Sequence, residues 1–296
     1  AKNNFKTLLI DEKNELGGAT IYQNKEFNKI NNQGSSDWIK KEINELKNIS
    51  NLEIKTRTSV AAYHGYNYLL ARENLTDHLE KKDKNNKVRQ RLLKIRAKKV
   101  ILATGALERP LIFNNNDRPG IMLSTAVKKY ADFFGVKCGE KNVFFTNNDS
   151  AYESALCLHN KGIKVDAIVD IRDNSNSKIV KAVEQAGIKI YWSHTVVDTN
   201  GYRRLDNISI MRLSNDGMTV TGKRINISCD CLGVAGGWTP AVHLFTQSGG
   251  KLKFDEDNNV FLPNKYPSDQ ISVGSCNGNF NLKEIINELS IKLKEF

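Results

Sequence analysis

The residues that could bind a ligand follow apolar runs at three points along the chain. The first run, Phe5–Ile10, is typical of a buried parallel strand, and Asp11 and Glu12 follow it at once. Gly17 and Gly18 come next. In dinucleotide-binding folds the second strand ends in a carboxylate that binds a ribose hydroxyl. A strand end in solvent is the better explanation of Asp11 taken alone. Together with the two later motifs, however, the pattern favours Asp11 or Glu12 as the ribose-binding carboxylate.

The other two points carry glycine at the end of an apolar strand. Residues 99–106 (KVILATGA) run into Thr104 and Gly105, where a glycine lets the backbone approach a dinucleotide or simply makes a turn. Gly274 and Ser275 follow a third apolar run, and a helix start there could face a pyrophosphate or be an ordinary capped helix. FAD-binding relatives of such folds carry Gly-Asp at this place. Ser275 therefore favours NAD over FAD.

A second strand–helix–strand unit begins at residue 142. Its pattern predicts a strand at 143–146, a helix at 150–161 and a strand at 165–169 that ends in Asp170. The turn between strand and helix, residues 147–149, has no glycine, and Asp149 adds a negative charge where a pyrophosphate would lie. We therefore predict that this second domain binds no NAD(P) and serves as a scaffold.

No pattern of catalytic or metal-binding residues stands out. The five cysteines and five histidines lack the spacing of a zinc site or of a nucleophile with its base, although Cys229 and Cys231 share one face of a strand. We predict no catalytic residue and no metal site in this chain, with reduced thiols in a cytoplasmic protein. His243 is the best histidine for a polar role near a ligand, but a structural role is favoured.

The composition is that of a globular protein with a basic surface. The net charge is +11 and the pI about 9.3, which raises the question of nucleic-acid binding. No basic stripe interleaves with aromatic residues, so we interpret the charge as a surface rich in lysine and asparagine and predict no nucleic-acid partner. No stretch approaches the roughly 20 apolar residues of a membrane span, so no membrane association is expected.

The order of strands and helices predicts an α/β flavoprotein fold with two dinucleotide-binding domains, similar to that of disulfide reductases. Residues 1–113 and 238–296 form the first, NAD-binding domain, which lacks its initial strand and phosphate loop. Residues 114–237 form an inserted Rossmann-like domain with a parallel, doubly wound sheet and a degenerate phosphate loop. Two helices are predicted with their own caps: 37–47, capped by Ser36 or Asp37, and 124–134, capped by Ser124.

Five long blocks make the sequence resemble the alpha subunit of heterotetrameric sarcosine oxidase. They are residues 108–111 (ERPL), 115–123 (NNDRPGIML), 146–152 (TNNDSAY), 236–245 (GGWTPAVHLF) and 247–252 (QSGGKL). The resemblance covers nearly all of this chain but only about a quarter of the family's longer subunit. We expect the chain to be an internal piece of such a subunit.

The resemblance implies an oxidoreductase that converts sarcosine and O2 to glycine, H2O2 and formaldehyde or 5,10-methylenetetrahydrofolate. It implies NAD on this subunit, FMN at the interface with the beta subunit, FAD on the beta subunit, and tetrahydrofolate in a C-terminal region outside this chain. The partners are beta, gamma and delta subunits. Carried over by motif, NAD would contact Asp11 or Glu12, Gly17, Gly18, Thr104, Gly105, Gly274 and Ser275, without being turned over.

Three other functions remain open on the sequence. The chain could belong to a related opine or hydroxyproline dehydrogenase, although the cysteine cluster that such subunits use for an iron–sulfur centre is lacking. It could be a non-catalytic scaffold that binds NAD and holds partner subunits. A stand-alone disulfide or flavin reductase is disfavoured because a C-x-x-C motif and a second phosphate loop are both lacking.

Overall fold

The computed structural model divides the chain into two compact units. It describes residues 5–22, 29–30, 32–84, 87–267 and 269–295. Unit 1 comprises residues 1–107 and 239–296, and unit 2 comprises residues 108–238. The first boundary lies six residues before the predicted one at 113, because Leu111 and Phe113 pack against the core of unit 2. The Phe113 ring meets the ring of Phe145 edge-on, with centroids 5.6 Å apart.

The parallel strands of unit 1 form two separate pairs. Strand β1 (Thr7–Ile10) pairs with β4 (Leu52–Lys55), and β8 (Val100–Leu102) pairs with β21 (Gln270–Ser272). All four residues of β1 are only half-buried, whereas the central strand of a parallel sheet is normally covered on both faces. Helix α1 (Ser35–Leu46) connects β1 to β4 along the chain.

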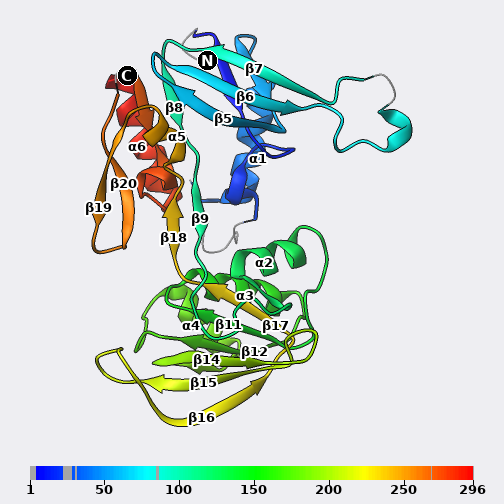
Figure 1. Cartoon of the computed structure of the whole chain (residues 1–296), viewed down its shortest axis with the longest axis vertical. Helices are drawn as coiled ribbons and strands as arrows, with labels where there is room; N and C mark the ends of the chain where they lie inside the picture. Colours follow the sequence, from blue (N-terminus) through cyan, green and yellow to red (C-terminus); the bar gives the residue numbers. More distant parts are fainter. Residues whose placement is uncertain (1–4, 23–28, 31, 85–86, 268, 296) are drawn as a thin grey trace. The chain divides into compact units, whose positions relative to one another are not determined.

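A three-stranded antiparallel sheet covers part of unit 1. It consists of β5 (Thr58–His64), β6 (Tyr68–Asn74) and β7 (Gln90–Arg96), drawn side by side in Figure 1. Its inner face packs on β8 and on α5 (His243–Gln247) in one buried cluster: Tyr63, Leu69, Val100, Leu102 and Phe245. The remaining elements of unit 1 are η1 (Gly18–Tyr22), β2 (Lys29–Ile30), β3 (Gln33–Gly34), η2 (Lys81–Asp83), the hairpin β19 (Lys251–Asp255) and β20 (Val260–Lys265), η3 (Gly274–Asn277) and α6 (Leu282–Glu295).

Unit 2 is built on a five-stranded parallel sheet. Its strand order is β10 (Ile121–Leu123), β17 (Cys231–Ala235), β11 (Asn142–Thr146), β12 (Val165–Asp170) and β13 (Ile190–Tyr191). The helices are α2 (Ser124–Asp132), α3 (Ser150–Asn160) and α4 (Lys178–Gln185). The chain passes between the units at β9 (Ala106–Glu108) and β18 (Trp238–Pro240).

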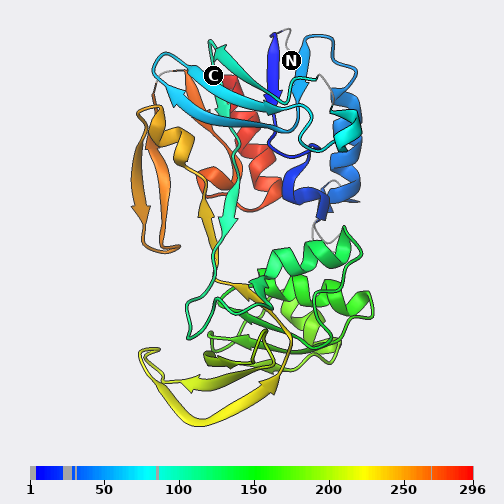
Figure 2. The same ribbon diagram turned by 45° about the vertical axis from the view of Figure 1, so that its right-hand side comes forward.

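The sheet of unit 2 is covered by helices on one face and by a second sheet on the other. That second sheet is antiparallel, with the order β14 (His194–Asn200), β15 (Asn207–Leu213) and β16 (Val220–Ser228). Figures 1 and 2 show it on the side of the parallel sheet opposite α3 and α4. The predicted doubly wound arrangement, with helices on both faces, was therefore wrong for this unit. Strand β14 and the hairpin formed by β15 and β16 cover that face instead.

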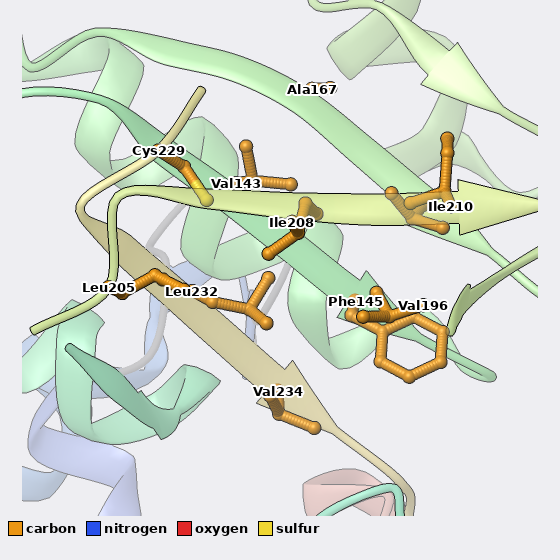
Figure 3. Close-up of a cluster of buried hydrophobic side chains, with 11 residues drawn as sticks. Val143, Phe145, Ala167, Val196, Leu205, Ile208, Ile210, Cys229, Leu232 and Val234 are labelled. Atoms are coloured by element: carbon orange, nitrogen blue, oxygen red, sulfur yellow. The ribbon is translucent and has the colours of Figure 1, made fainter. Parts of the chain in front are cut away.

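The core of unit 2 lies between these two sheets. Figure 3 shows Phe145 of β11 and Val234 of β17 on one side, facing Ile208 and Ile210 of β15. All four side chains are at most 2% exposed. Burial of each such side chain contributes on the order of 2 kcal/mol, so this layer fixes how the strands of unit 2 lie relative to one another.

Both predicted helix caps were wrong. Helix α1 begins at Ser35 after Gly34, without a side-chain cap, and Ser36 lies buried inside its first turn. Helix α2 begins at Ser124, whose Oγ lies 2.9 Å from Oγ of Ser154 in the interior. The first turn of α2 is instead capped by Glu108, which accepts the N–H of Thr125. No helix in the described part of the chain is long and apolar enough to cross a membrane.

Candidate functional site

The carboxylate predicted to bind a ribose is held at the end of β1. The Asp11 N–H donates to the carbonyl of Lys55 at 2.9 Å, and its own carbonyl accepts from the N–H of Thr58 at 3.0 Å. Asp11 Oδ1 accepts the N–H of Lys13 at 2.9 Å, which fixes the carboxyl group beside its own backbone. Glu12 is exposed, while Asp11 is half-buried. The structure therefore orders Asp11 more firmly than Glu12.

The glycines after β1 differ in what they require. Gly17 has φ +113°, and a Cβ there would meet the side chain of Ile21 at 2.8 Å. Gly18 has φ +55° and open space around the position of a Cβ. Gly17 is thus needed for packing and for its backbone conformation, whereas Gly18 leaves room for a ligand next to the backbone.

The turn after β8 is tied to the segment that re-enters unit 1. Thr104 Oγ1 donates to the carbonyl of Ala241 at 2.7 Å, and the N–H of Ala241 donates to the carbonyl of Gly105 at 3.0 Å. Gly105 has φ +75°, with nothing within 4 Å of a Cβ. The strand predicted to run into Thr104 and Gly105 ends at Leu102, and the chain turns at Gly105.

The turn after β21 is the third point where a nucleotide contact was predicted, and it already binds a side chain of the same unit. The N–H of Gly274 donates to Oε2 of Glu288 in α6 at 3.2 Å. Glu288 Oε1 accepts from Nδ2 of Asn277 and from Nζ of Lys292, both at 2.7 Å. Ser275 lies half-buried in the short η3 turn. The N–H group expected to face a pyrophosphate thus faces a carboxylate of the same unit.

Glu288 was not predicted from the sequence. Burial opposes its ionisation, but hydrogen bonds from Lys292, Gly274 and Asn277 outweigh burial and lower the pKa of Glu288. Lys292 also donates to the carbonyl of Ser272 at 2.8 Å, so the pair joins α6 to the end of β21. A Glu and a Lys four residues apart are common on helices, and nothing in their spacing marks this contact.

The corresponding position in unit 2 is closed by an ion-pair network. Asp170, at the end of β12, is 0% exposed and accepts the hydroxyl of Tyr152 at 2.8 Å. Arg172 donates Nη2 to Asp170 at 2.8 Å and places Nη1 2.8 Å from Asp149. Burial raises the pKa of Tyr152, and the two carboxylates raise the pKa of Arg172 against burial. Arg172 therefore bridges the loop carboxylate and the strand-end carboxylate.

The loop between β11 and α3 bonds both to itself and to the end of β17. Asn148 Oδ1 accepts the N–H of Ser150 at 2.9 Å and its hydroxyl at 2.6 Å. Asn148 Nδ2 donates to the carbonyl of Ala235 at 3.2 Å, and Thr146 Oγ1 donates to the carbonyl of Asn148 at 2.8 Å. A side-chain oxygen of the loop thus takes the helix N–H that a phosphate would otherwise accept.

Two of the blocks noted in the sequence meet in unit 2. The N–H of Arg109 donates to the carbonyl of Gly237 at 2.8 Å, and the N–H of Gly236 donates to the carbonyl of Arg109 at 2.6 Å. Glu108 is 8% exposed, and its Oε2 accepts the N–H of Thr125 at 3.0 Å. Glu108 thus caps α2, and burial raises its pKa although Thr125 opposes this shift.

The cysteines and histidines form no reactive centre among the residues that the structure describes. Cys229 and Cys231 are buried free thiols, and burial raises the pKa of each to about 12. A thiol with such a pKa is a poor nucleophile at neutral pH. No group of three or more potential metal ligands occurs in the described part of the chain. His243 is exposed at the start of α5.

Comparison with known proteins gives matches over most of the chain. A family model described as pyridine nucleotide-disulphide oxidoreductase matches residues 59–271. Proteins named sarcosine oxidase subunit alpha are 35% identical over 95% of this chain in Corynebacterium sp. (strain P-1) and 31% identical over 87% in Rhizobium meliloti (strain 1021). The chain spans 29% and 24% of the lengths of these relatives. The predicted resemblance is confirmed.

Solved structures share the fold. The T. acidophilum thioredoxin reductase is 17% identical with a TM-score of 0.69, over 96% of this chain and 87% of its own. The P. horikoshii L-proline dehydrogenase is 22% identical with a TM-score of 0.61, over 91% of this chain and 45% of its own. The predicted fold class, with two dinucleotide-binding domains as in disulfide reductases, is confirmed.

Proposed function

Since the chain belongs to the pyridine nucleotide-disulphide oxidoreductase family, we propose that it is the part of a sarcosine oxidase alpha subunit that holds NAD. Unit 1 binds the nucleotide without turning it over, and unit 2 serves as a scaffold. The sequence similarity to proteins named sarcosine oxidase subunit alpha supports this assignment.

One contrast between the two units carries the proposal. Asp11 of unit 1 is half-buried at its strand end, bonded to backbone groups nearby. Asp170, at the matching strand end of unit 2, is fully buried and already bonded to Tyr152 and Arg172. A ribose could therefore reach the carboxylate of unit 1 and not that of unit 2.

The residues at two of the three predicted points fit NAD. Asp11, with Glu12 beside it, would accept hydrogen bonds from the ribose hydroxyls, and Gly17 shapes the turn that follows. Gly18, Thr104 and Gly105 would let the dinucleotide lie against the backbone, because the space beside both glycines is open. Bound NAD supplies a nicotinamide able to accept hydride, which this chain would hold in place. Gly274 and Ser275 fit less well, since Glu288 takes the Gly274 N–H.

The free edge of β1 supports a further part of the proposal. Among the described residues β1 has a hydrogen-bonded strand only on its β4 side, and β8 pairs with β21. A strand carrying a G-x-G-x-x-G turn, added on the open side of β1, would supply the phosphate loop that neither unit provides. We therefore expect NAD to bind more tightly to the longer subunit than to residues 1–296 alone.

In the complete assembly, sarcosine and O2 would give glycine, H2O2 and formaldehyde or 5,10-methylenetetrahydrofolate. The beta subunit would carry FAD, FMN would lie where alpha meets beta, and tetrahydrofolate would bind a region of alpha outside this chain. Gamma and delta subunits complete the cytoplasmic complex. A related opine or hydroxyproline dehydrogenase is the alternative, and oxidation assays with sarcosine, an opine and hydroxyproline would separate the two.

The nucleotide site is tested by titrating NAD into the assembled enzyme by calorimetry. We expect Asp11→Asn to weaken binding about tenfold, because a neutral amide replaces a charge-assisted acceptor of two hydroxyl hydrogen bonds. The matched control is Asp117→Asn, an exposed aspartate of unit 2, which should leave the affinity unchanged. Equal affinity of the wild type and of Asp11→Asn would refute the assignment of Asp11.

A further inference from the structure

On the outer face of the β5–β6–β7 sheet, strands β6 and β7 carry three cations and three apolar or aromatic side chains. Cross-strand register places Tyr68 opposite Arg96, Leu70 opposite Lys94, and Arg72 opposite Leu92. These six residues point away from the core, because their neighbours Leu69 and Ala71 are buried beneath the sheet. We call this set of six residues the basic face.

Each cross-strand pair of the basic face joins a cation to an apolar or aromatic side chain. Each of its three cations lies opposite an uncharged residue, so no two cations are direct cross-strand neighbours. Arg72, Lys94 and Arg96 are exposed, and no ion pair is found for them among the described residues. The inner side of the same sheet differs, since Glu73 there pairs with Lys55 at 3.1 Å and with Arg91 at 3.5 Å.

The apolar members of the basic face are also accessible. Leu92 is 62% exposed, and Leu70 on the neighbouring strand is half-buried. A single exposed leucine is ordinary on protein surfaces. Here two leucines and a tyrosine lie opposite three arginine and lysine side chains. Tyrosine and arginine are residue types enriched in protein–protein interfaces.

From this arrangement we propose that the basic face docks an acidic, partly apolar polypeptide segment of a partner chain. Carboxylates of the segment pair with Arg72, Lys94 and Arg96, and its apolar side chains cover Leu70 and Leu92. Charge complementarity would steer the encounter, and burial of the leucines would slow dissociation. The proposal does not depend on the nucleotide site, which lies at the ends of β1 and β8.

Two other occupants fit the basic face less well. A second copy of this chain also carries a net charge of +11 and would present like charge to like charge. Single-stranded nucleic acid needs free aromatic faces for base stacking, but Tyr68 is the one ring of the basic face and the Arg96 guanidinium lies 5.4 Å from its centroid. The two leucines would gain nothing from a phosphate backbone.

The test uses a short fluorescent peptide of alternating glutamate and leucine, titrated with the purified protein and followed by anisotropy. The triple variant Arg72→Gln, Lys94→Gln, Arg96→Gln should bind about tenfold more weakly, since each exposed ion pair contributes roughly twofold. The matched control removes three exposed charges elsewhere: Lys178→Gln, Lys181→Gln, Lys223→Gln. It should bind like the wild type.

A second variant separates loss of docking from loss of folding. Leu92→Asp places a carboxylate at one end of the basic face, opposite Arg72, at a position that is mostly exposed. The fold should therefore persist while peptide binding weakens. Equal losses in both triple variants would show attraction by net charge alone and overturn the proposal. The proposal would also be overturned if a single-stranded DNA of equal length displaced the peptide and bound the basic-face triple variant more weakly than the wild type.

Discussion

The N–H of Gly274 donates to the carboxylate of Glu288 at 3.2 Å, which joins the turn after β21 to helix α6. The same carboxylate accepts from Lys292 and Asn277. A protein anion therefore stands where the glycine of this turn was expected to meet a phosphate. The contact stabilises unit 1 and makes its stability depend on pH.

Replacing Glu288 by Ala should lower the free energy of unfolding by about 2 kcal/mol at pH 7, because several hydrogen bonds to one charge are lost together. The pKa of Glu288 is lowered from 4.5, so its contribution is present above pH 4.5 and is lost as the pH falls through the folded-state pKa. Urea unfolding at several pH values measures both effects. Glu284→Ala, at an exposed position of the same helix, should lower the free energy of unfolding much less. A loss for Glu288→Ala that equals the loss for Glu284→Ala at every pH would contradict the contact.

Removing Arg172 should destabilise unit 2 strongly. Arg172→Ala leaves Asp170 fully buried without its cation, which costs about 3 kcal/mol or more. The double variant Asp170→Asn, Arg172→Met should recover part of that loss, because no uncompensated charge remains inside. Urea unfolding followed by tryptophan fluorescence gives the comparison, with the exposed Arg212→Ala as a control expected to be near neutral. A double variant no more stable than Arg172→Ala would argue against this explanation.

Glu108 should make unit 2 less stable as the pH rises. Burial raises its pKa above 4.5, so the folded state retains the proton that the unfolded chain has lost. The free energy of unfolding of the wild type, relative to that of Glu108→Gln, should therefore fall as the pH rises from 4.5 towards the folded-state pKa. Below pH 4.5 the two free energies should be similar. Thermal unfolding across this range tests the sign. Glu184→Gln, at an exposed position, should track the wild type throughout.

Gly236 should tolerate no side chain. A Cβ at this residue would lie 2.8 Å from the carbonyl oxygen of Pro110 and 2.9 Å from that of Arg109, and backbone atoms cannot move aside cheaply. We expect Gly236→Ala to cost about 3 kcal/mol in thermal or urea unfolding. Gly65→Ala is the control, since nothing lies within 4 Å of its Cβ position and it should change stability by less than about 0.5 kcal/mol.

The sequence by itself determined the order of elements and the family. Apolar runs and helical spacing located β11, α3 and β12 to within a residue or two, because local backbone preference and side-chain period depend on neighbours close in the chain. The placement of Asp11 at the end of a strand, and the lack of glycine in the loop before α3, could likewise be predicted. The blocks around Arg109 and Gly236 indicated the relationship to sarcosine oxidase alpha subunits.

Only the tertiary structure decided which distant groups meet. Glu288 reaches Gly274, Arg172 bridges Asp149 and Asp170, and Glu108 caps α2 through packing that no local spacing encodes. The domain boundary lies at residue 107 and not at the predicted residue 113 for the same reason, because Leu111 and Phe113 pack against the core of unit 2. Pairings of this kind depend on how separate elements close over a shared core, and apolar burial, which is non-directional, does not specify them in advance.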